Sequence, residues 1–409
     1  MKAQAVESNL TIGKSLRKLL RKKRLNCFED VDGIESFRND EFKVVRLIGE
    51  GGFASVFEIV HQQSSSTESD SAKSIVQPRH FAMKIVRYDR LDNKRLHKVA
   101  ASDLINETKI LSLLNHPNIV RLRAIPRHSH DSHFLVLDLL RDTLSERIQR
   151  WHAESHEQHQ IFPWKMDYAY QMALALEYLH SKHIIFRDLK PENVGFKDQH
   201  TVQLFDFGLA RQLKTLSSCE SETSVSSCDT SYQEKTFRLT RCGTLRYSAP
   251  EIVISGLYCL KSDCYSFGLV FWEMLTEVKP FHYMSPSVHK ILVCQRGERP
   301  PIYNYNFPWD VKELLTQCWE GRICDRLSIA QVCDRLLALL ENSAMIVVPG
   351  ARFKSKFRVD WESTTESGGD LFSGKEVGIE VEPIWMPEYL QKESGVALIQ
   401  ATEASRKQF

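Results

Sequence analysis

The stretch FRDLKPEN at residues 186–193 decides how the rest of the chain is interpreted. It places an acid (Asp188), a base (Lys190) and an amide (Asn193) close together, and the string DFG begins further on, at Asp206. Transfer of a phosphoryl group needs a group that orients the incoming hydroxyl, a cation near the transferred charge and oxygen ligands for metal ions. The first three residues occur in that order, and Asp206 adds a second hard oxygen ligand suited to Mg²⁺.

A glycine-rich turn lies upstream of this stretch. The string EFKVVRLIGEGGFASVFEIV at 41–60 alternates apolar and polar residues on both sides of GEGG, which is typical of a β-hairpin. Glycines have no side chains, so their backbone amides can approach phosphate groups, and Val56 stands behind them to pack on a flat base. On its own, such a turn is weak support for a nucleotide site. The glycines concerned are Gly49, Gly51 and Gly52.

A lysine lies inside an apolar strand that follows the hairpin. Lys84 belongs to HFAMKIV at 80–86, where an unpaired ammonium group would be costly to remove from water. It therefore needs anions, and Glu107, in a helix expected over roughly 96–114, is one candidate beside phosphate oxygens. Taken alone, Lys84 fits better a surface lysine whose aliphatic stem is packed.

Strands and helices are expected to segregate along the chain. Strand patterns extend to FLVLDLL at 134–140, and helical periodicity dominates beyond it, at 163–181, 263–276, 309–319 and 328–341. This segregation, rather than alternation of strands with helices, indicates an α+β protein with two lobes and a cleft between them.

The motifs taken together resemble those of the eukaryotic protein kinases, in family order and spacing over about 300 residues, Glu41 to Leu340. The resemblance implies a small β-rich N-lobe and a larger helical C-lobe. DLKPEN and GTLRYSAPE resemble the serine/threonine type, and RGERPPI at 296–302 with CWEGRICDRLS at 318–328 resembles the tyrosine-kinase-like group. ATP-dependent phosphorylation of protein serine and threonine hydroxyls, with Mg²⁺, is the implied activity.

The resemblance also implies a role for each matched residue. Asp188 would be the catalytic base, with Lys190 near the transferred group, and Lys84 would pair with Glu107 and hold the α and β phosphates. Asn193 and Asp206 would bind the two Mg²⁺ ions. The implied nucleotide-binding positions are Gly49, Gly51, Gly52, Val56, Ala82, Lys84, Leu137, Asp138, Leu140 and Asn193.

Three further positions have implied regulatory roles. Arg187 would receive a phosphate from the activation loop, and Thr240, four residues before Thr244, is the best candidate to carry it. Thr244 itself would hydrogen-bond near the catalytic loop. Family matches also pair Glu251 with Arg326 as a buried ion pair.

A second group of matches concerns the catalytic loop and its departures from the family pattern. Asp263 would support the catalytic loop from behind. Phe186 replaces the usual histidine and is expected to pack on Phe207 without the hydrogen bonds of an imidazole. Gly195 stands where the family places a large apolar residue beneath the adenine, so this wall is either thinner or filled by neighbours. Ala54 replaces the third glycine of the loop.

The expected organisation has three parts, with a serine-rich insert in the N-lobe and a long activation loop in the C-lobe. The parts are a basic N-terminal extension at 1–40, a kinase domain at 41–341 (N-lobe 41–140 with the insert 62–78, C-lobe 141–341 with the activation loop 206–251) and a C-terminal tail at 342–409.

Composition limits the partners and the compartment. The net charge of +2 neither indicates nor excludes nucleic acid, and no nucleic-acid partner is expected. Ten cysteines without a CxxC pair favour free thiols in a reducing compartment, cytoplasmic or nuclear. The basic stretch KSLRKLLRKKR at 14–24 fits a nuclear import signal, an anionic-membrane contact, an organelle transit peptide or a solvated helix. Two histidine groups, beginning at His128 and at His152, are explained by solvated connections better than by zinc.

Two other functions fit part of this pattern. A pseudokinase scaffold would bind partners through the same lobes, but Lys84, Asp188, Asn193 and Asp206 are all present. A small-molecule kinase would not need the Ala-Pro-Glu segment of protein kinases.

Overall fold

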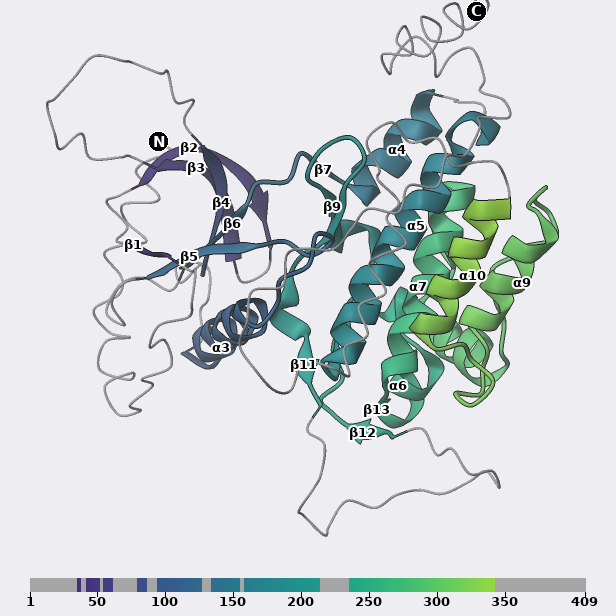
Figure 1. Ribbon diagram of the computed structural model, residues 1–409. Helices are drawn as coiled ribbons and strands as arrows, with labels where there is room; N and C mark the ends of the chain where they lie inside the picture. The colour runs from purple at the N-terminus through teal and green to yellow at the C-terminus, as the bar shows by residue number, and fades with distance from the viewer. Residues whose placement is uncertain are drawn as a thin grey trace, which may run out of the picture. The chain divides into compact units, whose positions relative to one another are not determined.

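The computed structural model (Figure 1) describes residues 35–37, 42–51, 54–61, 79–86, 94–126, 134–154, 158–213 and 235–342. The chain divides into two compact units, Met1–Asp334 and Arg335–Phe409, and the site described below lies within the first. The basic stretch 14–24, the insert 62–78, the group at His128 and the tail beyond residue 342 lie outside the described residues.

A six-stranded sheet dominates the N-terminal part. Its order is β1-β5-β6-β4-β3-β2, antiparallel except for the β1–β5 pair. The expected hairpin is present as β2 and β3, and the lysine strand as β4. Helix α3 (Lys94–Ser112) contacts β4, β5 and β6. The strands are β1 (Glu35–Phe37), β2 (Phe42–Glu50), β3 (Ala54–His61), β4 (His80–Val86), β5 (Leu122–Pro126) and β6 (Phe134–Asp138).

Helices dominate the part that follows (Figure 1). Helix α7 lies at its centre, and its residues from Ser262 to Thr276 are all buried, as expected of a helix that is apolar on most sides. Helix α7 contacts both α5 and α9. The helices are α4 (Leu144–Glu154), α5 (Gln158–Ser181), α6 (Pro250–Ser255), α7 (Leu260–Thr276), α8 (Pro286–His289), the π-helix η5 (Lys290–Gln295), α9 (Trp309–Cys318) and α10 (Ile329–Asn342).

Short strands and 3₁₀ turns lie among the helices of this second part. One small sheet has the order β10-β9-β7, and the pairs β11–β8 and β12–β13 are antiparallel ribbons. These elements are β7 (Asp142–Thr143), β8 (Ile184–Ile185), η2 (Pro191–Asn193), β9 (Val194–Phe196), β10 (Val202–Leu204), η3 (Phe207–Leu209), β11 (Arg211–Gln212), β12 (Phe237–Arg238), η4 (Leu245–Tyr247) and β13 (Leu257–Tyr258). The α+β class with a strand-rich part before a helical part is therefore confirmed.

Several element boundaries differ from the sequence prediction by one to five residues, most of all at the start of α5. Helix α5 begins at Gln158, not at 163, and Pro163 lies inside it. Strand β6 ends at Asp138, whose N–H donates to the carbonyl of Arg121, and Leu139 and Leu140 continue as a connecting segment, called here the hinge. Within the described residues, no helix is long and apolar enough to cross a membrane.

Candidate active site

Lys84 links the sheet to α3 and to the DFG turn. The β3–β4 register sets Lys84 opposite Val56, directly behind the glycine hairpin. Its Nζ lies 2.6 Å from Oε2 of Glu107 and 2.8 Å from Oδ1 of Asp206. Burial alone would lower the pKa of Lys84, but the two carboxylates raise it above its ordinary value, so the lysine stays charged. The expected Lys84–Glu107 pair is confirmed, and Asp206 joins it.

The two carboxylates differ in their environment. Glu107 is 1 % exposed, and burial raises its pKa despite Lys84. Asp206 has a side chain that is 44 % exposed, and its pKa is lowered because Lys84 and then Lys190 outweigh the effect of burial. Lys190 of the catalytic loop is thus close enough to stabilise the charged form of Asp206. The catalytic loop and the DFG turn therefore form one site.

Helix α3 holds the DFG turn through a residue that the sequence reasoning missed. Nδ2 of Asn106 donates to the carbonyls of Gly208 (3.1 Å) and Ala210 (3.0 Å). The neighbouring Glu107 accepts the N–H of Phe207 at 3.1 Å. The one signal for Asn106 in the sequence was its place directly before Glu107, because a side-chain amide there can donate to main-chain carbonyls.

The carboxylate of Asp188 is held on both oxygens. Oδ1 accepts hydrogen bonds from the N–H and the hydroxyl of Thr244, both at 2.9 Å. Oδ2 accepts from Nζ of Lys190 at 2.7 Å and from Nδ2 of Asn193 at 3.1 Å. Lys190 also donates to the hydroxyl of Thr244 at 3.2 Å. The structure therefore brings together the base, the cation and the amide of the sequence prediction, and Thr244 with them.

The catalytic loop is anchored from behind by Asp263, as expected. Its carboxylate accepts the main-chain N–H of Phe186 (2.8 Å) and of Arg187 (3.0 Å), and it contacts Nε2 of His180 at 3.0 Å. Arg187 has φ 73°, a left-handed conformation that non-glycine residues rarely adopt without support. Asp263, 1 % exposed, supplies part of that support.

Phe186 packs as predicted. Its ring meets that of Phe207 edge to face, with centroids 5.0 Å apart, and the two side chains are 1 % and 0 % exposed. Such pairs stabilise by about 0.5–1.5 kcal/mol beyond burial. The phenyl ring thus connects the catalytic loop with the DFG turn by packing alone.

Strand pairing in the six-stranded sheet places several of the predicted nucleotide-binding residues on neighbouring strands. Gly49 pairs with Val56, and the N–H of Gly51 donates to Ala54 at 2.8 Å, which closes the turn. Ala82 pairs with Leu137 on β6. Gly52 lies outside the described residues.

The wall near Gly195 is filled by neighbouring side chains. A Cβ at this position would clash with Cδ1 of Leu140 and lie 3.2 Å from the ring of Phe205. The thinner wall considered from the sequence is therefore absent, because Leu140 occupies the space that the glycine leaves.

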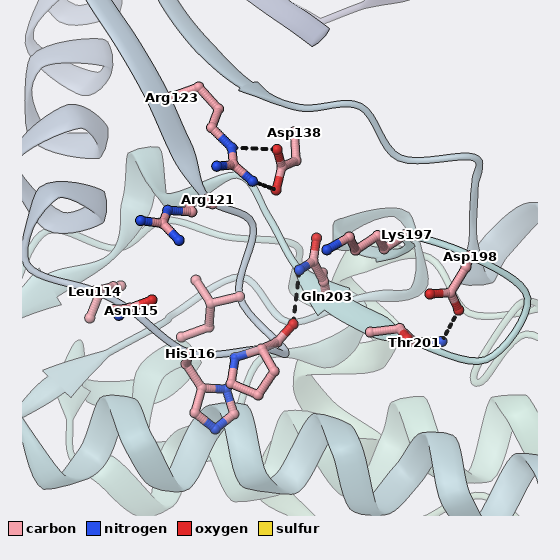
Figure 2. Close-up of a pocket in the computed structure, with 12 residues that line it drawn as sticks. Leu114, Asn115, His116, Arg121, Arg123, Asp138, Lys197, Asp198, Thr201 and Gln203 are labelled. Carbon is pink, nitrogen blue, oxygen red and sulfur yellow. Dashed lines mark hydrogen bonds and ion pairs between the residues drawn. The ribbon is translucent and has the colours of Figure 1, made fainter. Parts of the chain in front are cut away.

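Asp138 differs from the other predicted nucleotide-binding residues. Its carboxylate accepts two hydrogen bonds from Arg123, at 2.6 and 2.8 Å, and its N–H donates to Arg121. Its carboxylate and its N–H are therefore already engaged within the protein. The side chain faces a separate cavity (Figure 2).

The predicted ion pair between Glu251 and Arg326 is confirmed. Two parallel contacts of 2.8 and 3.0 Å join the carboxylate and the guanidinium, and the hydroxyl of Ser262 donates to Glu251 at 2.8 Å. Arg326 is 1 % exposed, so loss of either partner would leave a buried charge unpaired.

The donor set suits a hard cation at Asn193 and Asp206. Nδ2 of Asn193 donates to Asp188, and the side-chain oxygen Oδ1 of Asn193 has no donor among the described residues. The carboxylate of Asp206 is partly exposed. Amide and carboxylate oxygens are the ligands that Mg²⁺ prefers. No cluster of three or more His, Cys, Asp or Glu residues that could hold a metal occurs in the described ranges.

Comparison with known proteins agrees with this geometry. Serine/threonine-protein kinase STY46 of Arabidopsis thaliana is 28% identical over 319 residues (76% of this chain, 48% of that protein). Serine/threonine/tyrosine-protein kinase HT1 of the same plant is 29% identical over 280 residues (68% and 64%). cAMP-dependent protein kinase type 3 of Saccharomyces cerevisiae (strain ATCC 204508 / S288c) is 28% identical over 307 residues (74% and 65%).

Each match covers a larger share of this chain than of the relative. The chain spans about half the length of STY46 and less than two thirds of the other two relatives. A family model described as a protein kinase domain matches residues 42–337, which include both lobes and every residue of the site above. The chain therefore belongs to the protein kinase family.

Proposed function

We propose that this protein transfers the γ-phosphoryl group of ATP to serine and threonine hydroxyls of protein substrates. The observation that carries the proposal is the arrangement around Asp188. Both of its oxygens are hydrogen-bonded, and Lys190 stands 2.7 Å away. A base held in this way is ready to receive a substrate hydroxyl, because its rotamer is fixed before the substrate arrives.

The family uses ATP and a divalent metal generally, and the finer assignment to this chain is part of the proposal. Lys84, kept charged by Glu107, would hold phosphate oxygens, and Asn193 and Asp206 would hold Mg²⁺. When bound, the metal ions supply neutralisation of the charge that develops on the transferred group.

The chain's own residues carry out the remaining tasks. Asp188 orients the incoming hydroxyl and accepts its proton. Lys190 places a positive charge beside that carboxylate, and Thr244 keeps both in place through its hydroxyl. Catalysis of this kind consists mainly of positioning and electrostatic stabilisation, which a preformed network supplies without reorganisation.

Phosphate transfer to a degenerate peptide library tests the proposal. The protein is incubated with ATP and Mg²⁺, and the libraries carry serine, threonine or tyrosine as the only hydroxyl residue. We expect transfer to serine and threonine, and none with Asp188→Asn. Nucleotide binding without transfer would instead support a pseudokinase scaffold, and transfer only to tyrosine would contradict the hydroxyl assignment.

We further propose that phosphorylation of Thr240 regulates this site. Arg187 is 8 % exposed, and its guanidinium donates to the carbonyls of Leu209 (2.6 Å) and Thr240 (3.5 Å) and lies over the ring of Tyr258. These partners are neutral, and burial lowers the pKa of Arg187. A phosphate on the exposed Thr240 would give the arginine an anion and could form one to three charge-assisted bonds.

Phosphosite mapping on the active protein, followed by substitution, tests this regulation. Thr240→Ala is expected to lower activity, and Ser226→Ala, in the segment outside the described residues, is expected to leave it unchanged. Loss of activity in the serine variant alone would contradict the assignment to Thr240. The nuclear-import or anionic-membrane contact of residues 14–24 and a cytoplasmic or nuclear location stay predictions.

A further inference from the structure

A cavity beside the hinge shares only Asp138 with the nucleotide-binding positions. It has a volume of about 210 Å³ and opens between the segment joining α3 to β5 and the turn joining β9 to β10 (Figure 2). Its wall is more polar than apolar. The charged and amide side chains that matter here are Arg121, Arg123, Asp138, Lys197, Asp198 and Gln203.

The charges of this wall do not balance. The carboxylate of Asp138 is engaged by Arg123 at 2.6 and 2.8 Å, and that of Asp198 accepts the main-chain N–H groups of His200 and Thr201. The two remaining cations, Arg121 and Lys197, are exposed and form no ion pair with any residue that the structure describes. Figure 2 draws these two side chains on opposite sides of Gln203. Three cations and two acids leave an excess positive charge at the cavity.

Gln203 supplies a second, independent observation. It is 4 % exposed, and its Nε2 donates to the carbonyl of Pro117 at 2.8 Å, which fixes the orientation of the amide. Its Oε1 is buried and has no donor among the described residues. A buried acceptor without a donor is unfavourable and is a place where an external group can add a hydrogen bond.

The cavity therefore needs an anion and an N–H or O–H donor together. Sulfate, which carries no proton, supplies the first but not the second. A phosphate ion that keeps a proton supplies both, so the test below separates phosphate from peptide. An acidic peptide supplies both, because each residue carries a main-chain N–H beside a carboxylate side chain. We propose that this cavity binds an acidic peptide segment of a protein partner, with a main-chain N–H donating to Oε1 of Gln203 and carboxylates facing Arg121 and Lys197.

Fluorescence polarisation with labelled hexaglutamate and the full chain tests the charge requirement. We expect saturable binding that weakens about tenfold or more when Arg121→Gln and Lys197→Gln are combined. Lys290→Gln removes an exposed lysine outside the cavity and is expected to change nothing. Absence of saturable binding, or an equal loss in the Lys290 variant, would overturn the proposal.

The donor requirement is tested with an acrylate oligomer of the same carboxylate number, which has no N–H groups. We expect the peptide to bind the wild-type protein several-fold more tightly, and we expect Gln203→Leu, checked for an unchanged melting temperature, to remove that preference. If Gln203→Leu does not fold, the wild-type comparison alone decides. Equal affinities, or displacement of the peptide by equimolar inorganic phosphate, would show a general anion site and contradict the peptide assignment. Binding is read without phosphoryl transfer, so the result is independent of the proposed activity.

Discussion

The side chain of Leu140 occupies the space beneath β9 that a side chain at Gly195 would need. Gly195 pairs with Gln203 and with Thr143 in the small sheet, so its backbone cannot easily move away. The hinge and β9 therefore meet where Leu140 packs against Gly195.

Gly195→Leu is expected to be overpacked. The clash with Leu140 and the close approach to Phe205 should lower the free energy of unfolding by about 1–3 kcal/mol and weaken ATP binding. Leu140→Ala in the same chain should restore most of both losses, which denaturant unfolding and calorimetric titration with ATP would measure. Additive losses in the double variant would show that the two residues do not share this space.

Thr244 is expected to act as a positioning residue through its hydroxyl. Thr244→Val keeps the shape but removes the bonds to Asp188 and Lys190, so kcat should fall by about ten- to a hundredfold with a small change in KM. Thr244→Ser keeps the hydroxyl and should stay within a few-fold of wild type. Steady-state kinetics on one peptide compares them, and equal kcat values for the two variants would assign the role to the main-chain N–H alone.

Glu273 is expected to make stability depend on pH. This carboxyl, 5 % exposed, accepts the hydroxyl of Tyr247 at 2.7 Å, and burial, with the nearby charge of Glu192, raises its pKa to about 7. The folded state therefore binds more protons than the unfolded state between an ordinary pKa of 4.5 and about 7. The contribution of Glu273 to the free energy of unfolding is at its maximum below that window. It falls as pH rises through the window, by roughly 3 kcal/mol in total.

Urea unfolding of wild type and Glu273→Gln across that window measures the effect. The glutamine can still accept the bond from Tyr247 but does not ionise. We expect wild type to lose stability relative to the variant as pH increases towards 7. A difference that is constant with pH would contradict the raised pKa.

Sequence motifs predicted most of the site because the chemistry restricts each position strongly. Asp188, Asn193 and Asp206 belong to short motifs in which few other residues can do the same chemistry, so the motifs located them directly. Lys84 lies in an apolar strand, and its charge therefore required an anionic partner. Asn106 escaped prediction because one amide in a helix has no distinctive pattern; its role depends on how α3 approaches the DFG turn.

Tertiary contacts decided the remaining points. The filling of the space at Gly195 by Leu140 depends on how the hinge lies against β9, which no local pattern encodes. The short strands β1 and β5 were missed because brief segments carry little periodicity and are defined by pairing with distant residues. The cavity around Gln203 likewise joins segments far apart in the chain.

The most direct test of the central claim is the turnover number for peptide phosphorylation by Asp188→Asn and Asp206→Asn, each compared with wild type at saturating ATP and Mg²⁺. Asp188 is held by Thr244 and Lys190, and Asp206 by Lys84, so each amide variant keeps the shape while it loses the charge. We expect kcat to fall by a factor on the order of a thousand or more in each, with little change in melting temperature. Turnover equal to wild type in both folded variants would contradict the proposal that this protein is a protein kinase using these two carboxylates.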